Sequence, residues 1–144
     1  MEWDTGIVLH TECNDDDLAY IWNGILEYNR TVGPMLKYPP YEPLNLILKD
    51  SAGKVVGGLQ SKIYLHCIFV SALWIDEEYR KCGYGSRLMA EAERRAKEQG
   101  CEFIHLDTFS FQGIDFYLKL GFEVFGTLAD FPGGVVRYFL KKTL

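Results

Sequence analysis

LWIDEEYRKCGYGSRL, residues 73–88, runs from an apolar strand-like segment through a glycine-punctuated turn directly into an amphipathic helix. Gly83 and Gly85 allow the backbone to come close to a ligand. The first turn of a helix carries N–H groups that have no intrahelical acceptor and that lie at the positive end of the helix dipole. The stretch therefore predicts a nest of backbone donors suited to a phosphate, and in particular to a pyrophosphate.

The flanking residues favour this interpretation over an ordinary strand-to-helix turn, which stays the alternative. Cys67 to Ile75 is almost entirely apolar, as expected for a strand buried on both faces. After the turn, apolar or small residues recur at helical spacing, and Gly100 is a suitable helix stop; they are Tyr84, Gly85, Leu88, Met89, Ala92 and Ala96. The glycine series is too short for a Rossmann fingerprint, and the Gly-Lys-Ser/Thr of a P-loop is missing.

A second block carries a further motif. A strand-like segment, Phe103 to Phe109, precedes QGIDFYLKLGF at residues 112–122. Together, Arg80-x-x-Gly83-x-Gly85 and the ending FYLKLGF resemble the acyl-CoA-binding core of the GNAT superfamily of N-acetyltransferases. The resemblance covers roughly residues 44–140. Within the superfamily, this sequence is similar to small bacterial members without an assigned substrate.

This resemblance implies a fold of the mixed α/β (α+β) class. Its sheet is expected to be mostly antiparallel, flanked by helices and splayed between the fourth and fifth strands. The chain has 144 residues, 48% of them apolar and 24% charged, which fits a single domain spanning residues 1–144 with a sizeable core.

Local patterns predict the remaining elements. Ile7 to Glu12 is expected to form the first strand, and Asn14 to cap a helix. The buried stripe of that helix is expected to be Leu18, Ile21, Trp22, Ile25 and Leu26. The proline-rich stretch from Tyr28 to Pro43 predicts an irregular, substrate-facing loop, and a turn at residues 50–53 predicts a hairpin.

The resemblance also implies how acetyl-CoA is held. The pantetheine arm would bond to the edge of the fourth strand around Trp74 and Ile75. Amides of the loop would receive the pyrophosphate, with charge added by Arg80 and Lys81; the loop residues are Lys81, Cys82, Gly83, Tyr84, Gly85 and Ser86. Many relatives have a glycine and a basic residue at the positions of Lys81 and Cys82, and the loss of that glycine is expected to make the turn less permissive here. Ser110 stands where relatives carry a cofactor-contacting Asn.

Direct acetyl transfer to an amine sets two chemical demands. The departing CoA thiolate benefits from a proton, and Tyr117 matches the family's general acid. The amine must lose a proton, which at pH 7 costs on the order of 4–5 kcal/mol for a group of pKa about 10.4. The fourth strand offers no carboxylate at residues 69–73, so Asp107, His66 and a water relay stay open as alternatives.

The acceptor site is expected to draw on Tyr28, Tyr38, Asp130 and Phe131, which offer aromatic walls and an acid to an amine of a small molecule or peptide. A non-catalytic acyl-CoA-binding or sensing domain is the alternative function. A net charge of −5 disfavours nucleic acid. No metal-ligand spacing, signal peptide or membrane-spanning run is present, so a cytoplasmic protein without metal is expected. The terminal strand at 135–140 could pair in a homodimer.

Overall fold

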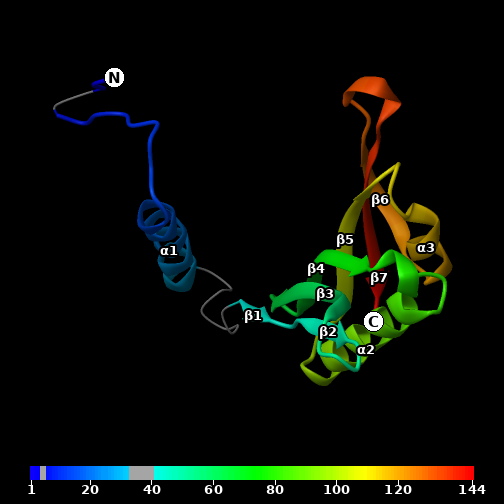
Figure 1. The fold of residues 1–144 in the computed structure, drawn as a ribbon. Helices are drawn as coiled ribbons and strands as arrows, with labels where there is room; N and C mark the ends of the chain where they lie inside the picture. Colours follow the sequence, from blue (N-terminus) through cyan, green and yellow to red (C-terminus); the bar gives the residue numbers. More distant parts are fainter. Residues whose placement is uncertain (4–5, 33–40) are drawn as a thin grey trace. The chain divides into compact units, whose positions relative to one another are not determined.

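The computed structural model describes residues 1–3, 6–32 and 41–144, which fall into two compact units, Met1–Tyr38 and Pro39–Leu144 (Figure 1). Each unit is described by itself. Among the described residues, no helix combines the length and the apolar character needed to cross a bilayer.

Helix α1, Asp15–Thr31, is the main element of the N-terminal unit. Its capping box confirms the predicted N-cap: the Asn14 side chain accepts from the Asp17 N–H at 2.9 Å, and the Asp17 carboxylate accepts from the Asn14 N–H at 3.2 Å. Three aspartates in the first turn lie at the positive end of the helix dipole. The helix continues through Tyr28 and Arg30, so the prediction of an irregular loop is wrong for these residues, and most of the predicted loop, residues 33–40, lies outside the described residues.

One expectation for this unit is wrong. Ile7 to Glu12 does not form a strand, because a strand needs a hydrogen-bonded partner and only the isolated bridge between Glu2 and Val8 is formed there. Within its own unit, α1 has no buried residue, so the N-terminal unit by itself does not cover the predicted apolar stripe. The burial of that stripe stays a prediction.

The C-terminal unit is built on a seven-stranded sheet, and the sheet is mostly antiparallel, as the family resemblance implied. The strand order is β1-β3-β4-β5-β7-β6, with β2 also paired to β3. The strands are β1 Glu42–Pro43, β2 Leu46–Lys49, β3 Val55–Tyr64, β4 Cys67–Ile75, β5 Phe103–Phe109, β6 Glu123–Leu128 and β7 Arg137–Thr143. The other elements are α2 Tyr84–Glu98, α3 Ile114–Lys119 and the 3₁₀ turns η2 Glu77–Tyr79 and η3 Pro132–Gly134.

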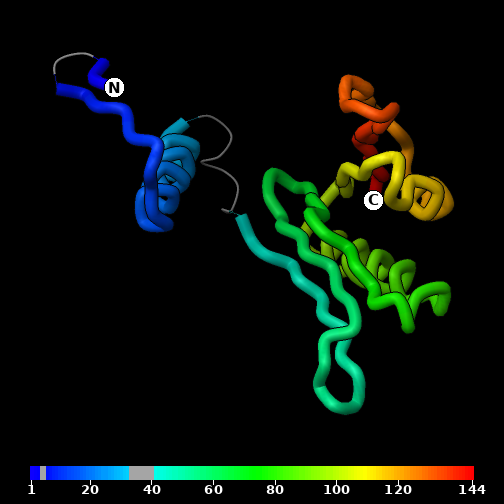
Figure 2. The backbone as a smooth tube through the Cα atoms, turned by 45° about the horizontal axis from the view of Figure 1, so that its top comes forward, coloured from blue at the N-terminus to red at the C-terminus, as the bar shows by residue number. Residues whose placement is uncertain are grey.

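One strand pair departs from the antiparallel pattern. β4 and β5 are parallel and pair only at Cys67 with Phe103, Ile68 with Ile104, and Phe69 with His105. Beyond Phe69, β4 keeps its pairing with β3, and β5 keeps its pairing with β7. The sheet therefore opens between β4 and β5 as predicted. In Figure 2, the chain of β2, β3 and β4 (cyan to green) and the chain of β5, β6 and β7 (yellow to red) can be followed as two successive groups.

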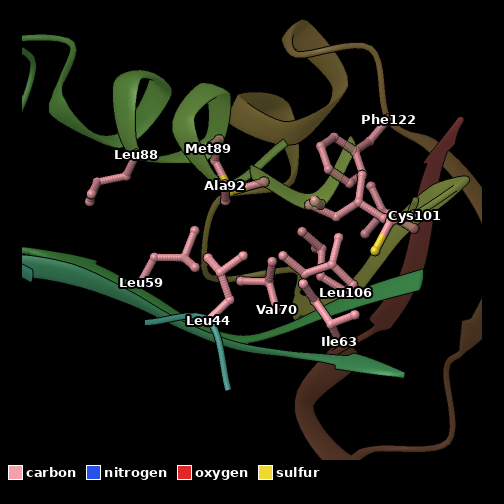
Figure 3. Close-up of a cluster of buried hydrophobic side chains, with 14 residues drawn as sticks. Leu44, Leu59, Ile63, Val70, Leu88, Met89, Ala92, Cys101, Leu106 and Phe122 are labelled. Carbon is pink, nitrogen blue, oxygen red and sulfur yellow. The ribbon is translucent and has the colours of Figure 1, made fainter. Parts of the chain in front are cut away.

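The core lies between α2 and one face of the sheet. Leu88, Met89 and Ala92 of α2 meet strand side chains such as Leu59 and Leu106 (Figure 3). Ile104, Leu106 and Thr108 alternate along β5 toward this core. Because successive strand side chains point to opposite faces, the alternate residues of β5, such as Asp107 and Phe109, lie on the other face.

The hairpin and helix-end predictions are confirmed. The Asp50 side chain accepts the N–H groups of Ala52 and Lys54 at 2.9 Å, and Gly53 has φ +84°, which closes the β2–β3 turn. Helix α2 ends at Glu98, and Gly100 has φ +82° just beyond it.

Ile104→Ala is expected to lower the free energy of unfolding by about 2–5 kcal/mol, because Ile104 is fully buried and its truncation leaves a cavity. Ile47→Ala is the matched control, since Ile47 is also a strand isoleucine but is 52% exposed, and it should cost less than about 1 kcal/mol. Urea unfolding measures both. Equal losses would contradict the placement of the core.

Candidate functional site

A cavity of about 830 Å³ occupies the opening between β4 and β5. All of its lining residues belong to the C-terminal unit. Its walls come from β4, the loop before α2, the end of β5 and α3; the lining residues are Val70, Ser71, Ala72, Leu73, Trp74, Ile75, Tyr79, Arg80, Lys81, Gly83, Tyr84, Gly85, Ser86, Leu106, Asp107, Thr108, Gln112, Gly113, Phe116 and Tyr117. Most of the predicted cofactor residues thus surround one cavity, together with Tyr117 and Asp107.

The backbone amides of residues 81–86 have no hydrogen-bond acceptor among the described residues. The first bond of this region runs from the Arg87 N–H to the Gly83 carbonyl at 3.1 Å. Gly83 caps α2 in the left-handed conformation, φ +83°, and provides no side-chain acceptor for the first turn. With no acidic residue in that turn, the open amides and the helix dipole suit an anion such as a diphosphate.

Lys81 shows what the substitution of a glycine does to this loop. Its φ is +60°, so a residue with a Cβ adopts the left-handed region. That conformation costs an ordinary L-residue about 1–2 kcal/mol relative to the right-handed region. The turn keeps its donors at the expense of strain, as the sequence suggested.

The Arg80 side chain holds the loop against β4. Its Nε donates to the Ile75 carbonyl at 2.8 Å, and Asp76 caps the intervening turn η2 by accepting the Glu78 N–H at 3.1 Å. Cys82 is exposed and does not line the cavity. Its Sγ lies 3.4 Å from the carbonyl oxygen of Arg80. The Cys82 contribution to the loop is therefore its backbone amide.

Helices α2 and α3 approach closely at the cavity. A Cβ on Gly85 would lie 3.3 Å from Cζ of Phe116, which is tighter than an ordinary contact. Phe116 in turn packs edge-to-face on Tyr117, with ring centroids 5.1 Å apart. The glycine at position 85 therefore brings the loop amides and the helix that carries Tyr117 together.

Tyr117 lies partly buried at the cavity wall. Its ring packs edge-to-face on Phe122 at 5.8 Å between centroids. Burial, and secondly the negative charge of Asp107, raise the pKa of the Tyr117 phenol above its ordinary value. The phenol thus holds its proton to higher pH than an exposed tyrosine, and its environment includes the Asp107 carboxylate.

Asp107 is paired with Arg137 of β7. Nε and one terminal nitrogen of the guanidinium both bond to Oδ1 of Asp107, at 3.0 and 2.8 Å. The second carboxylate oxygen, Oδ2, accepts from no residue that the structure describes. His66, the other candidate base, is in the exposed β3–β4 turn and does not line the cavity.

Ser110, Asp130 and Phe131 belong to the C-terminal unit and are not among the residues that line the cavity. The Ser110 hydroxyl accepts the Val136 N–H at 3.1 Å and so joins the end of β5 to the start of β7. Phe131 packs edge-to-face on Phe109 at 5.5 Å, while Asp130 is exposed beside it. Tyr28 lies on α1 of the N-terminal unit, and Tyr38 is outside the described residues.

Comparison with known proteins decides the family of the chain. The profile of the acetyltransferase (GNAT) family matches residues 9–122, well over half of the sequence. The chain belongs to the GNAT family. Members of this family acetylate their acceptors with acetyl-CoA, and the GNAT interpretation of the sequence is confirmed.

Two relatives that are more than 30% identical agree with this family, and a third, more distant protein shares the fold. Blasticidin-S acetyltransferase from Streptomyces morookaense is 33% identical over 112 residues, covering 77% of this chain and 82% of the relative. A 1.9 Å crystal structure of an acetyltransferase from Bacillus cereus is 36% identical with TM-score 0.81, covering 95% of this chain and 98% of that one. A Bacillus anthracis acetyltransferase in complex with acetyl coenzyme A shares the fold at 22% identity and TM-score 0.63, covering 71% and 62%.

Two side chains of this GNAT site were missed by the sequence analysis. Gln112 lines the cavity, and its Oε1 accepts the Phe109 N–H at 2.8 Å, which shapes the turn between β5 and α3. Arg137 bonds to Asp107. The alternating pattern of the last strand predicts only on which face of the sheet Arg137 lies, because the register that places Arg137 near Asp107 depends on the tertiary pairing of β5 with β7. Among the described residues, no group of three or more potential ligands could hold a metal ion.

The strain at Lys81 can be measured with two variants that both lack its charge. Lys81→Gly is expected to be more stable than Lys81→Ala by about 1 kcal/mol, because only glycine adopts the left-handed conformation without cost. Chemical unfolding of the two variants gives this difference. If alanine is as stable as glycine here, the loop does not require a left-handed residue at this position.

The environment of Tyr117 predicts a titration shift. The pKa of its phenol should exceed the ordinary value of about 10, and Asp107→Asn should bring it down, because that change removes one of the two causes that raise it. Carbon-13 NMR of protein labelled at the tyrosine Cζ measures both, with the Tyr117→Phe variant identifying the signal. If the pKa of Tyr117 were unchanged in Asp107→Asn, the charge of Asp107 would not act on the Tyr117 phenol, and the prediction would be wrong.

Proposed function

We propose that this GNAT protein is an N-acetyltransferase that moves the acetyl group of acetyl-CoA directly to a primary amine of a small molecule or peptide. The observation that carries the proposal is the convergence of the open loop amides and Tyr117 on one cavity between β4 and β5. Acetyl-CoA, when bound, supplies the activated thioester. The chain's own residues would bind and orient the carrier, donate one proton to the departing sulfur and accept one proton from the amine.

Binding is assigned to backbone groups at both ends of the cavity. The amides of residues 81–86 would hold the diphosphate, and Arg80 and Lys81 add positive charge to the same wall. The edge of β4 beyond Phe69 has no partner in β5 and would bond to the pantetheine arm around Trp74 and Ile75. These contacts depend on backbone geometry rather than on particular side chains.

Tyr117 would act as the general acid. As the new N–C bond forms and the C–S bond breaks, the phenol would donate its proton to the departing sulfur. The raised pKa of Tyr117 keeps that proton available at neutral and mildly alkaline pH. Its position at the cavity wall, on the helix that packs against the loop through Phe116, supports this role.

Asp107 is the proposed proton acceptor for the amine. It is the carboxylate that lines the cavity, and Oδ2 is left open because Arg137 occupies Oδ1. A water relay to solvent is the alternative path for this proton, as β4 supplies no carboxylate at residues 69–73. In both cases the acceptor must enter near the end of β5.

The first acceptor to test is blasticidin S, because a relative named for its acetylation is 33% identical over most of this chain. A panel of polyamines, aminoglycosides, amino acids and short peptides extends the search to other primary amines. Aromatic side chains near Asp107, including Phe109 and Phe131, offer stacking surfaces at the proposed entrance.

Tyr117→Phe is expected to lower kcat by roughly 100-fold while leaving acetyl-CoA affinity within about twofold, since the phenol acts on the leaving sulfur and not on the diphosphate. Release of free CoA measures turnover, and calorimetry measures binding. Tyr138→Phe is the matched control, because Tyr138 is a partly buried tyrosine of the same unit that does not line the cavity. Its kcat should equal that of the wild type.

Two results would contradict the proposal. Wild-type turnover in Tyr117→Phe would remove Tyr117 from the acid role. Tight acetyl-CoA binding with no turnover on any amine would favour the alternative function, a non-catalytic acyl-CoA-binding or sensing domain.

A further inference from the structure

Four side chains form a compact arrangement on the face of the sheet opposite the α2 core. In the antiparallel β5–β7 pair, Asp107 lies directly opposite Phe139, and Phe109 lies directly opposite Arg137. The four residues are therefore neighbours on one face of the sheet, and Arg137 reaches its diagonal neighbour, Asp107. Diagonal neighbours in a sheet are within reach of long side chains.

The guanidinium of Arg137 is fixed by contacts on several sides. Its central carbon lies 5.5 Å from the centroid of the Phe109 ring and 5.3 Å from that of Phe139, within the range of cation–π attraction. Phe109 is itself held by a stacked Phe111, with ring centroids 5.3 Å apart and planes within 7° of parallel. Arginine presents a planar fork, so rings and hydrogen bonds together define its orientation.

This fixed fork bonds one oxygen of Asp107. The two nitrogens that bond to Oδ1 lie at 2.8 and 3.0 Å, and the Asp107 and Arg137 side chains are only 23% and 35% exposed. Charge-assisted bonds of this length are strong and directional. The bonds immobilise the carboxylate while leaving Oδ2 without a donor among the described residues, at the wall of the cavity.

We propose that Arg137 is a positioning residue for acetyl transfer: held in contact with the rings of Phe109 and Phe139, it bonds Oδ1 of Asp107 so that Oδ2 accepts a proton from the incoming primary amine. Arg137 acts through Asp107 and does not itself contact the reacting atoms. This inference rests on the proposed function of Asp107 and adds a residue on which that function depends.

The role predicts a specific kinetic pattern. A misplaced reacting group typically loses rate because the productive geometry is populated less often. Arg137→Gln should therefore lower kcat by roughly 10- to 100-fold. The KM for acetyl-CoA should stay within about twofold, since the carrier is held by the loop amides and the β4 edge.

The decisive experiment is a double-mutant cycle measured by CoA release with the acceptor found active in the amine panel. Asp107→Asn removes the group through which Arg137 acts, so Arg137→Gln should have no further effect in that background. Arg137→Lys should recover part of the lost rate, because it restores the charge without the planar fork. Wild-type kcat in Arg137→Gln, or independent multiplication of the two effects, would overturn the inference.

Arg94→Gln is the matched control. Arg94 also pairs with carboxylates, at 2.7 Å from Glu91 and 2.6 Å from Glu98, but on the exposed face of α2 and away from the cavity lining. Its kcat should equal that of the wild type. Thermal unfolding and acetyl-CoA calorimetry of every variant identify any loss that comes from folding, and Arg137→Lys replaces Arg137→Gln if the latter does not fold.

Nitrogen-15 NMR of the Arg137 Nε–H separates this inference from the proposed function. Its bond to Oδ1 should slow exchange with solvent in the wild type and lose that protection in Asp107→Asn. Equally fast exchange in both proteins would contradict the inference even if no amine were turned over. Protected exchange, together with no turnover on any amine, would instead leave the pairing intact and refute the proposed acetyl transfer, and with it the positioning role.

Discussion

The parallel pairing of β4 with β5 ends at Phe69 and His105, and the rest of the site depends on this early ending. Each strand remains bonded on its other side, to β3 and to β7, so the sheet stays intact on both sides of the opening. The space between the strands becomes a cavity with backbone donors and acceptors along one wall. A sheet that remained paired to Ile75 would have no room for a ligand.

Backbone and side chains divide the work of the site. The loop before α2 needs open amides and a left-handed turn, which Gly83 provides without cost and Lys81 provides with strain. In the proposed reaction, the other end of the cavity needs particular chemical groups, and these come from β5, β7 and α3. The loop accommodates Cys82, whose side chain does not line the cavity, while the proposed proton transfers depend on Tyr117, Asp107 and Arg137.

Local patterns in the sequence predicted much of the C-terminal unit. The period of α2, the Asp50 turn and the glycine that follows α2 are local features, and each was found as expected. Ile7 to Glu12 failed because strand formation depends on a partner, which local alternation does not reveal. Arg137 was missed for the related reason that register between β5 and β7 is set by the whole sheet.

The contact between Gly85 and Phe116 has a consequence for the acyl donor of the proposed reaction. A Cβ at position 85 would lie 3.3 Å from Cζ of Phe116, so α2 and α3 meet there with little room to spare, and packing limits the span from the loop amides to the Tyr117 phenol. In the proposed reaction, a donor must match that span with its own spacer between diphosphate and thioester. Truncated thioesters that lack the nucleotide would then engage only the Tyr117 end, so the proposed site would select its donor by length as well as by the chemistry of its acyl group.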